Sequence, residues 1–484
     1  MSDWDAARVA TAAGAVLLGG ASEAADAPPR AAVDTRTLCP GELFVGIKGE
    51  REDGGARAAE ALAAGAWGVL VAPEHAKAIA AGGVSGSVLA HPRPLAGLQA
   101  LARAWRRELG AAGCRVVAIT GSTGKTSTKD ILAALLEAEL ATVASPANLN
   151  TEIGLPLAIL AAPPGTRALV LEMAMRGAGQ IAELAAIAEP DVGVIVNVGP
   201  AHLELLGSLE NIAAAKAELI AGLRPGAAAV VPAQEPLLEP HLRADLRTIA
   251  FGDGGDVAMI GLADPPGGGT GSGVRIAVEG DEIELWPSFS QAHNLSNLLA
   301  AVGAAAALGN RPEGRLHVEF SAMRGQRERL PSGAVLIDDC YNANPMSMRA
   351  AIDDLVATWR AGRVGPDSRT VAVLGDMLEL GPESLALHRE IGAHARDAGI
   401  DFLVTVGPLA AEIGAAFGGD GPGPPSPSLP DAAAAAQVVP GLVGAGDTVL
   451  VKASRGVGLE RVSVALREAS ARDPAPTAAR GGSD

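Results

Sequence analysis

A glycine-rich loop, Gly-Ser-Thr-Gly-Lys-Thr-Ser at residues 121–127, constrains this chain more than any other feature. An apolar stretch at 115–120 precedes it and predicts a buried strand, and a helical pattern over 125–139 follows it. In a strand–loop–helix unit of this kind, the glycines let backbone N–H groups turn toward phosphate oxygens, and the helix N-terminus adds positive potential. We therefore predict that Lys125 reaches the outer phosphates of ATP and that Thr126 holds Mg²⁺. The alternative is an ordinary strand–helix turn.

The rest of the chain alternates strand and helix patterns, which predicts an α/β protein with parallel sheets. Near the start, strands are expected at 43–45 and 68–71 with a helix at 56–64 between them. Further buried strands are expected at 168–171, 192–198, 334–337, 370–374, 402–406 and 448–451. The last four predict a doubly wound sheet of the dinucleotide-binding type. Residues 253–286 alternate more and contain many glycines, which favours a small antiparallel excursion.

The chain has 484 residues, which is enough for about three domains. We predict an N-terminal domain over 1–92, a central domain over 93–310, a C-terminal domain over 311–469 and a disordered tail over 470–484. The Gly- and Pro-rich segment 418–430 is expected to be a mobile loop. The weakly apolar run 9–20 follows Asp3 and Asp5 rather than basic residues, so we interpret it as an amphipathic helix and not as a signal peptide.

Composition narrows the class of function. The formal net charge of −17 repels phosphate backbones, so nucleic acid is not an expected partner. No strongly apolar stretch is long enough to predict a membrane span. Cys39, Cys114 and Cys340 match no metal or disulfide spacing, which favours a reducing cytoplasm. Only six Phe, five Trp and one Tyr are present, so small and branched side chains must fill the core.

Three further residues are candidates for metal and charge handling. Glu172 ends a predicted buried strand, where strand ends of an open α/β sheet face the ligand crevice, and its carboxylate suits Mg²⁺ beside Thr126. His202 follows the next strand, but a lone histidine is more often structural than a ligand. By pattern alone, Lys216 is a surface lysine of a helix.

Several motifs occur together in an order that resembles the Mur ligases, which build the peptide of bacterial peptidoglycan. The central motifs are the phosphate loop, A-N-L-N-T-E-I-G-L-P (147–156), E-M-A-M-R-G (172–177), N-V-G-P-A-H-L (197–203), A-K-A-E (215–218) and A-H-N-L-S-N-L-L-A-A (292–301). The later ones are I-D-D-C-Y-N-A-N-P-M-S-M (337–348), V-L-G-D-M-L-E-L-G (373–381) and V-L-V-K-A-S-R-G (449–456). The early ones are D-T-R (34–36) and G-E-L-F-V-G-I-K-G-E-R-E-D-G (41–54).

This resemblance implies a three-domain Mur ligase architecture, with a central P-loop ATPase-like domain and a C-terminal Rossmann-like domain. It also implies site residues. ATP would be bound by Gly121, Ser122, Thr123, Gly124, Lys125, Thr126, Ser127, Asn294, Arg327 and Asp339. Two Mg²⁺ ions would be held by Thr126, Glu172, His202 and a carbamylated Lys216. Catalysis would fall to Lys125, His202, Lys216 and Arg327. The other substrates would contact Thr35, Arg36, Asp53, Asn148, Asn150, Asn342, Asn344, Lys452 and Arg455.

The implied reaction is ATP-dependent amide-bond formation between UDP-N-acetylmuramoyl-tripeptide and D-alanyl-D-alanine, through an acyl phosphate, by a cytoplasmic monomer. One alternative is a Mur-type ligase that adds a different amino acid. Another is a nucleotide-binding protein without ligase chemistry. Asn342, Asn344, Lys452 and Arg455 could equally serve as structural turn residues.

Four positions depart from the usual family pattern. Cys340 stands where Ser is common, and Thr151 replaces an Asn. Ala453 replaces a Gly, and Gly55 replaces a His that commonly follows Asp-Gly. The change at Gly55 bears on recognition of the uridine nucleotide.

Overall fold

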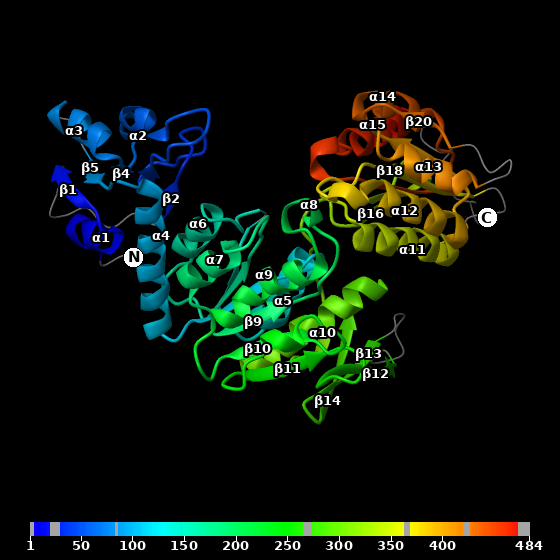
Figure 1. Ribbon diagram of the computed structural model, residues 1–484, viewed down its shortest axis with the longest axis horizontal. Helices are drawn as coiled ribbons and strands as arrows, with labels where there is room; N and C mark the ends of the chain where they lie inside the picture. Colours follow the sequence, from blue (N-terminus) through cyan, green and yellow to red (C-terminus); the bar gives the residue numbers. More distant parts are fainter. Residues whose placement is uncertain are drawn as a thin grey trace, which may run out of the picture. The chain divides into compact units, whose positions relative to one another are not determined.

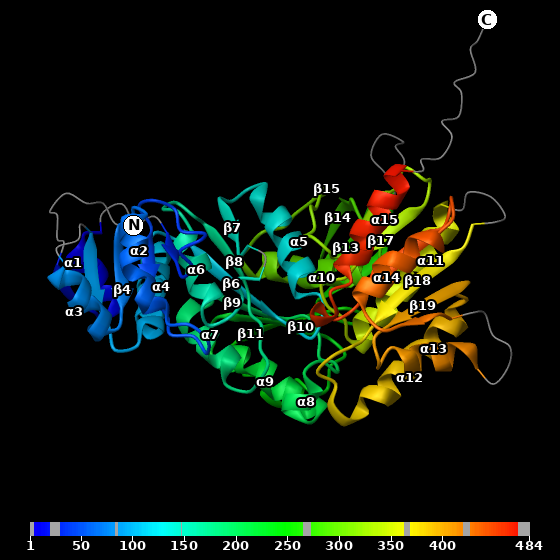
Figure 2. The same cartoon turned by 90° about the horizontal axis from the view of Figure 1, so that it is seen from above.

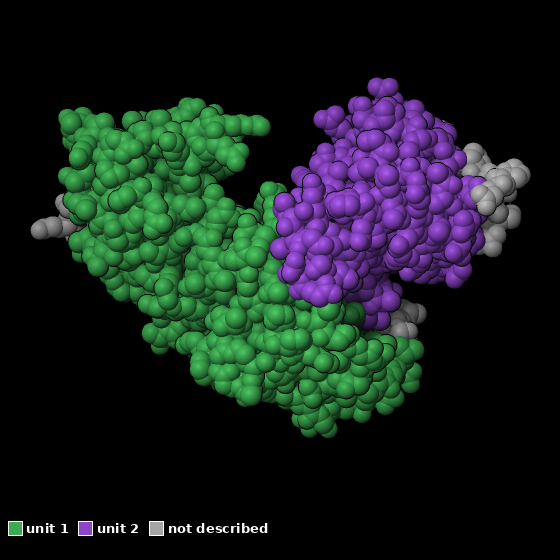
Figure 3. Space-filling model, viewed as in Figure 1, with its two compact units in different colours: residues 1–197, 213–288, 296–318 green, residues 198–212, 289–295, 319–484 purple. Residues whose placement is uncertain are grey.

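The computed structural model describes residues 4–19, 30–82, 86–146, 148–264, 273–362, 368–419 and 426–472. The chain forms two compact units, which Figure 3 colours separately. Unit 1 consists of residues 1–197, 213–288 and 296–318, and unit 2 of residues 198–212, 289–295 and 319–484. Within the described residues, unit 1 contains two β-sheets and unit 2 contains one, so the predicted α/β class is confirmed.

The first sheet of unit 1 has the strand order β1-β5-β4-β3-β2, with β1 antiparallel to β5 and the other pairs parallel. Every residue of β3 and β4 is buried, as their apolar runs predict. The strands are β1 (Val16–Gly19), β2 (Ala31–Ala32), β3 (Leu43–Val45), β4 (Gly68–Val71) and β5 (Ser87–Ala90). The helices are α1 (Ala6–Ala13), η1 (Gly54–Arg57), α2 (Ala58–Ala63) and α3 (Pro73–Ala81).

The N-terminal run does not form the single amphipathic helix that its sequence predicts. Helix α1 ends at Ala13, because Gly14 takes a left-handed conformation with φ of 64°. The chain then extends as β1 and pairs with β5 at the edge of the sheet. The weakly apolar residues after Gly14 therefore form a strand, a difference that a helical pattern alone does not reveal.

The second sheet of unit 1 carries the glycine loop. Its order is β15-β14-β13-β12-β11-β10-β9-β6-β8-β7. The strands are β6 (Arg115–Thr120), β7 (Thr142–Ala144), β8 (Ala168–Glu172), β9 (Val192–Ile195), β10 (Ala228–Pro232), β11 (Arg247–Phe251), β12 (Val257–Ala263), β13 (Gly273–Val278), β14 (Asp281–Pro287) and β15 (Gly314–Leu316). Strands β6 to β11 pair in parallel, whereas β12, β13 and β14 are antiparallel neighbours, which confirms the predicted excursion.

Helices cover both faces of the parallel part of this sheet (Figures 1 and 2). Figure 2 shows α5 and α10 on one side of the strands and α7 and α9 on the other. The helices are α5 (Lys125–Glu137), α6 (Gly154–Ala161), α7 (Gln180–Ala188), α9 (Leu209–Ala221) and α10 (Ala292–Ala307), with η2 (Glu239–His241) as a short turn. This double cover explains why β6, β8 and β9 are continuous apolar runs.

Helix α4 (Pro94–Ala111) belongs to the cores of both sheets of unit 1. It packs on α1, β3 and β4 of the first sheet and on α6 and α7 of the second. Trp105 meets Trp4 edge to face, while its indole N–H donates to Ala162 O. Arg106 is buried and pairs with Asp191 at 2.9 Å. One helix thus joins the two sheets.

Unit 2 contains the third sheet, in the order β16-β17-β21-β18-β19-β20. All its neighbouring strands are parallel except β16 and β17. The strands are β16 (Gln326–Arg329), β17 (Val335–Asp338), β18 (Thr370–Gly375), β19 (Phe402–Val406), β20 (Ser428–Leu429) and β21 (Thr448–Lys452). The helices and turns are α8 (Leu203–Leu206), α11 (Pro345–Gly362), η3 (Gly381–Glu383), α12 (Ser384–Ala398), α13 (Ala411–Gly418), α14 (Ala432–Val438), η4 (Val439–Gly441), η5 (Arg455–Val457) and α15 (Glu460–Arg472).

The third sheet is doubly wound, as its alternating pattern predicts. Apolar residues of α11, α12 and α13 form one buried cluster with the strands, and residues of α14 and α15 form another. Helix α15 continues to Arg472, and the rest of the predicted tail, residues 473–484, lies outside the described part. Of the predicted loop 418–430, residues 420–425 lie outside it too, and Ser428–Leu429 forms β20. No helix among the described residues is suited to crossing a membrane.

Candidate functional site

Three parallel strands of the second sheet end at one edge and place the candidate site there. Ile119 of β6 is in register with Glu172 of β8, and Thr120 is in register with Ile195 of β9. The glycine loop leaves β6 at this edge and enters α5. In an open α/β sheet, ligands bind beside the carboxyl ends of the strands.

The conformation of the glycine loop requires its glycines. Gly124 caps α5 in a left-handed conformation with φ of 77°, and Gly121 has φ of 159°. A Cβ atom on Gly124 would lie 2.4 Å from Asn297 Oδ1. A side chain at position 124 is therefore excluded by both backbone strain and space, which supports the prediction of a loop shaped to bring N–H groups to phosphate.

Asn197, for which the sequence predicts no role, stabilises the glycine loop by hydrogen bonds. Its Oδ1 accepts from the backbone N–H of Ser122 at 3.1 Å and of Thr123 at 2.9 Å. Its Nδ2 donates to Thr123 O and Oγ1 at 3.2 and 3.1 Å. The motif N-V-G-P contained this residue, but only the fold shows that it reaches back to the loop.

Oxygen donors for a cation gather behind the loop. Thr126 Oγ1 donates to Glu172 Oε2 at 2.8 Å, and Asn150 Nδ2 donates to Glu172 Oε1 at 2.8 Å. Glu172 is only 2% exposed. A buried carboxylate in contact with a hydroxyl is the hard oxygen set that Mg²⁺ takes beside nucleotide phosphates, so these residues fit the predicted metal. Asn150 lies with this set rather than with the residues of the first sheet.

Lys216 is a buried lysine and not the surface residue that its helical pattern suggests. It is 1% exposed on α9. Burial, with a smaller effect of the nearby Lys125 charge, lowers the pKa of Lys216 well below its usual value. Lys125 itself donates from Nζ to Gly121 O at 2.8 Å across the glycine loop. The structure thus brings Lys125, Thr126, Glu172 and Lys216 together in unit 1.

Four further residues predicted for the nucleotide or the metal belong to unit 2, namely His202, Asn294, Arg327 and Asp339. Arg327 forms an ion pair with Asp354, and Asp339 pairs with Lys452 Nζ at 2.6 Å. Burial lowers the pKa of His293, whose neighbourhood includes Asp354 and Asp339. Asn294 is buried beside it on α10. His202 pairs through Nδ1 with Glu379.

The residues predicted to hold the dipeptide have structural roles in unit 2. Lys452 Nζ donates to Asn342 O at 2.9 Å, and Asn344 Oδ1 accepts from Ser347 N at 2.9 Å at the start of α11. The guanidinium of Arg455 lies 5.8 Å from the centre of the Tyr341 ring. These positions make structural contacts within unit 2, and substrate contact stays a prediction for them.

The first sheet carries the residues predicted for the uridine nucleotide. Hydrogen bonds from Arg36 lower the pKa of Asp34 to about 2, and Thr35 Oγ1 donates to Glu60 at 3.2 Å. Asp53 Oδ2 lies 3.0 Å from His75 Nε2, and a Cβ atom on Gly55 would lie 2.3 Å from His75 Cδ2. Sequence reasoning missed His75, although the departure at Gly55 pointed to this place. The carbonyl oxygen of Asn148, another predicted substrate contact, accepts a hydrogen bond from the backbone N–H of Asn150.

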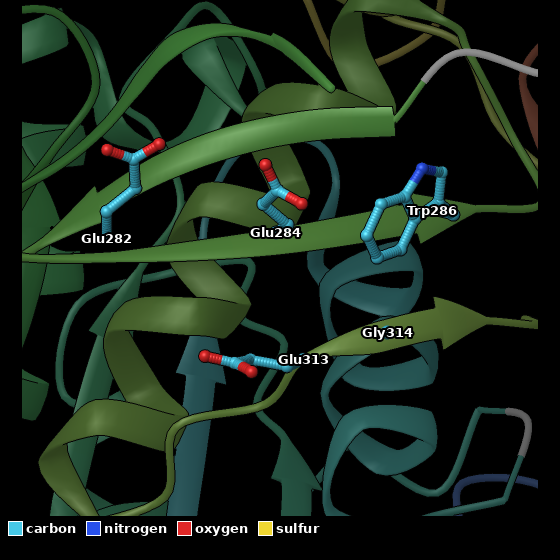
Figure 4. A pocket seen from close by; sticks show the side chains of 5 residues that line it. All are labelled: Glu282, Glu284, Trp286, Glu313 and Gly314. Atoms are coloured by element: carbon cyan, nitrogen blue, oxygen red, sulfur yellow. The ribbon is translucent and has the colours of Figure 1, made fainter. Parts of the chain in front are cut away.

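A hollow of about 330 Å³ lies beside β14 and β15 of the second sheet, and none of the predicted site residues lines it (Figure 4). Glu282, Glu284, Glu313, Trp286 and Gly314 line it. Trp286 Nε1 donates to Asp264 O, and Glu282 pairs with Arg275. Among the described residues, no group of three His, Cys, Asp or Glu could hold a metal ion.

Two family models match the central and C-terminal parts of this chain. The Mur ligase middle domain matches residues 119–305, and the Mur ligase glutamate ligase domain matches residues 323–455. The UDP-N-acetylmuramoyl-tripeptide–D-alanyl-D-alanine ligase of Bacillus subtilis (strain 168) is 34% identical over 89% of this chain and 91% of its own. The ligase of the same name from Mycobacterium tuberculosis (strain H37Rv) is 37% identical over 90% and 91%. The chain belongs to the Mur ligase family.

Solved Mur ligases share the fold over nearly the full length. MurF from Acinetobacter baumannii matches with a TM-score of 0.82 and 26% identity, over 96% of this chain and 99% of that one. MurF from Thermotoga maritima in complex with ADP matches with a TM-score of 0.74 and 30% identity, over 92% and 98%. The predicted Mur ligase fold is therefore confirmed.

Three departures from the usual Mur ligase pattern are accommodated by packing. Cys340 Sγ is buried and donates to Asp338 Oδ1 at 2.8 Å; burial and this carboxylate raise the pKa of the thiol. Thr151 Oγ1 accepts from Gly154 N at 3.4 Å. The Ala453 methyl group packs beside Gly375. None of these substitutions removes a hydrogen-bonding group of the glycine loop.

Proposed function

We propose that this chain joins D-alanyl-D-alanine to UDP-N-acetylmuramoyl-tripeptide at the expense of ATP, in peptidoglycan precursor synthesis. The observation that carries the proposal is an intact phosphate loop, with Thr126 and Glu172 in contact behind it, in a chain similar over about nine-tenths of its length to ligases of that name. The terminal carboxylate of the tripeptide attacks the γ-phosphate of ATP and releases ADP. The amine of the dipeptide then attacks the acyl phosphate and expels phosphate.

Charge neutralisation is the main task of such a site, because a carboxylate must approach a triphosphate. Lys125 supplies positive charge at the loop, and Arg327 supplies it from unit 2. Thr126 and Glu172 would hold Mg²⁺, which offsets the charge of the phosphates when bound. Asn294 and Asp339 would contact adenine and ribose, and Thr35, Arg36 and Asp53 the uridine nucleotide.

The decisive measurement is ADP release with the uridine-linked tripeptide, in the presence and absence of D-alanyl-D-alanine. We expect release that depends on the dipeptide, and a loss of at least about 100-fold in kcat for Lys125→Ala, because a charge-neutralising group is removed from the phosphates. ADP release with another amino acid instead of the dipeptide would favour a Mur-type ligase that adds a different amino acid. ATP turnover that ignores every acceptor would contradict the ligase function.

We further propose that Lys216 is carbamylated. Its burial favours the neutral amine, which adds to CO₂ to give a carbamate and releases one proton. The product is an anion suited to a second Mg²⁺, where an ammonium group would be repelled.

The carbamate can be detected directly. In protein equilibrated with ¹³C-labelled bicarbonate, we expect one carbamate ¹³C resonance, lost in Lys216→Arg. Lys129 is the matched control, because it is 3% exposed but pairs with Asp130 at 3.0 Å. Lys129→Arg should keep the resonance. A wild-type spectrum without it would contradict the carbamate.

A further inference from the structure

The loop that carries His202 is held in an unusual backbone conformation within unit 2. His202 has φ of 62° and precedes α8, where its carbonyl accepts from the N–H groups of Leu205 and Leu206. Left-handed backbone at a residue other than glycine costs free energy and persists where the surroundings impose it. The surroundings of His202 therefore hold its backbone in this conformation at the start of α8.

Glu379 meets this imidazole from the loop between β18 and η3, 177 residues further along the chain. His202 Nδ1 and Glu379 Oε2 lie 2.5 Å apart, so the two side chains are joined by a hydrogen bond. Glu379 is also left-handed, with φ of 63°, and its carbonyl accepts from Glu204 N at 3.2 Å. A side-chain contact and a backbone contact thus join the same two loops.

Gly381 allows the loops to approach this closely. A Cβ atom on Gly381, which has φ of 62°, would lie 3.0 Å from Glu204 Cα. The backbone at Glu204 is therefore packed closely against the residues that follow Glu379, so the two loops are not joined by the His202–Glu379 pair alone.

We propose that Glu379 is a positioning residue, which holds His202 with its proton on Nδ1 and its lone pair on Nε2. That tautomer is the one a metal ligand needs, and histidines that bind metals usually donate their other N–H to a carboxylate. The proposal rests on the proposed ligase function and on the role of metal ligand that the family resemblance implies for His202. Glu379 itself touches neither substrate nor metal in this scheme.

The first test reads the tautomer without any ligand. Imidazole ¹⁵N resonances of the full-length protein are recorded for wild type, Glu379→Ala and Glu379→Gln, with His202→Gln for assignment. We expect the Nδ1–H tautomer in wild type and in Glu379→Gln, because the carbonyl oxygen of glutamine can still accept the hydrogen bond from Nδ1–H. Glu379→Ala should give a mixture of tautomers. The exposed Glu383, in the turn η3 that follows this loop, is the matched control as Glu383→Ala.

The second test separates positioning from a general structural role. We expect Glu379→Ala to lower kcat by about 10–100-fold, with the KM for the uridine-linked tripeptide unchanged. Glu379→Gln should restore most of the rate, and Glu383→Ala should match wild type. A wild-type Nε2–H tautomer, or a Glu379→Ala protein with unchanged tautomer and kcat, would overturn the positioning role alone. A wild-type protein inactive with the tripeptide and dipeptide would instead overturn the ligase function.

Discussion

His75 shows how one side chain can fill the space left by another. Position 55 is a glycine, and the ring of His75 from α3 lies where a side chain at 55 would have to go. The ring also contacts Asp53, and the hydrogen bond from His75 is the main cause that lowers the pKa of Asp53. Gly55 and His75 therefore form one packing unit, and a change at either position depends on the other.

A double-mutant cycle tests this coupling. Gly55→His should reduce the free energy of unfolding by about 1–3 kcal/mol, because it overpacks the contact with His75. In the double variant Gly55→His, His75→Ala, we expect most of that loss to disappear, since the clash is removed. Denaturant unfolding of the four proteins gives the coupling. Additive effects would show that the two side chains do not compete for space.

The sequence predicts site residues unevenly, and the reason is visible residue by residue. Lys125, Thr126 and Glu172 are predictable because strand ends and a glycine loop have fixed chemistry. Asn197 and Glu379 are not, because each acts through a partner far away in the sequence. The burial of Lys216 also escapes its local pattern, since a helix of alanines around one lysine does not reveal which face is covered.

At the level of elements, long apolar strands were well predicted and short edge strands were not. Strands β6 and β19 begin and end as expected, because both are buried on two faces. The sequence does not predict the edge strand β1, since only the left-handed turn at Gly14 separates it from α1.

The junction after α7 is another feature that the sequence does not predict. Glu189 ends the helix with φ of 41° and forms ion pairs with Arg103 and Arg107 of α4.

This junction should make stability depend on pH. Burial raises the pKa of Glu189, but hydrogen bonds from Arg107 and Arg103 outweigh it and lower the pKa to about 2. A carboxylate with a lowered folded-state pKa stabilises the fold above its unfolded pKa, and this stabilisation is lost as the pH falls from about 4.5 toward about 2. Glu189→Gln should therefore cost about 1–2 kcal/mol at pH 7, after allowance for solvent screening.

Urea unfolding of wild type and Glu189→Gln between pH 7 and pH 3 measures the effect. The difference between the two proteins should stay constant down to about pH 4.5 and shrink as the pH falls below that value. Glu137 is exposed on α5, so Glu137→Gln serves as the control and should follow wild type throughout. A difference that stays constant with pH would mean that Glu189 acts through packing and not through its charge.

At the scale of the whole molecule, the sequence predicts three α/β domains, and the structure contains three sheets in two compact units. The compact units do not follow the order of the chain: residues 198–212 group with unit 2, whereas residues 213–288 and β15 belong to unit 1. The sequence cannot predict which unit such a short segment joins, since this depends on which sheet the segment packs against. The domain limits at 92, 310 and 469 remain predictions.

Ligand-driven closure is the prediction at this scale. Lys125 lies in unit 1 and Arg327 in unit 2, and both are expected at the phosphates of one ATP molecule. An acyl phosphate must also be shielded from water. We expect the radius of gyration from small-angle X-ray scattering to fall when a non-hydrolysable ATP analogue and the uridine-linked tripeptide are both present. Scattering that does not change with both ligands would contradict closure.

Helix α4 has few exposed residues at which a substitution would leave the fold undisturbed. Of its 18 residues, only Arg103, Arg107 and Ala111 are exposed, and both arginines are tied to Glu189. In an ordinary amphipathic helix, residues on the exposed face can be substituted freely while residues on the buried face are conserved by packing. Here a substitution disturbs one sheet or the other, so compensating mutations for a damaged α4 should arise in two separate regions of the protein.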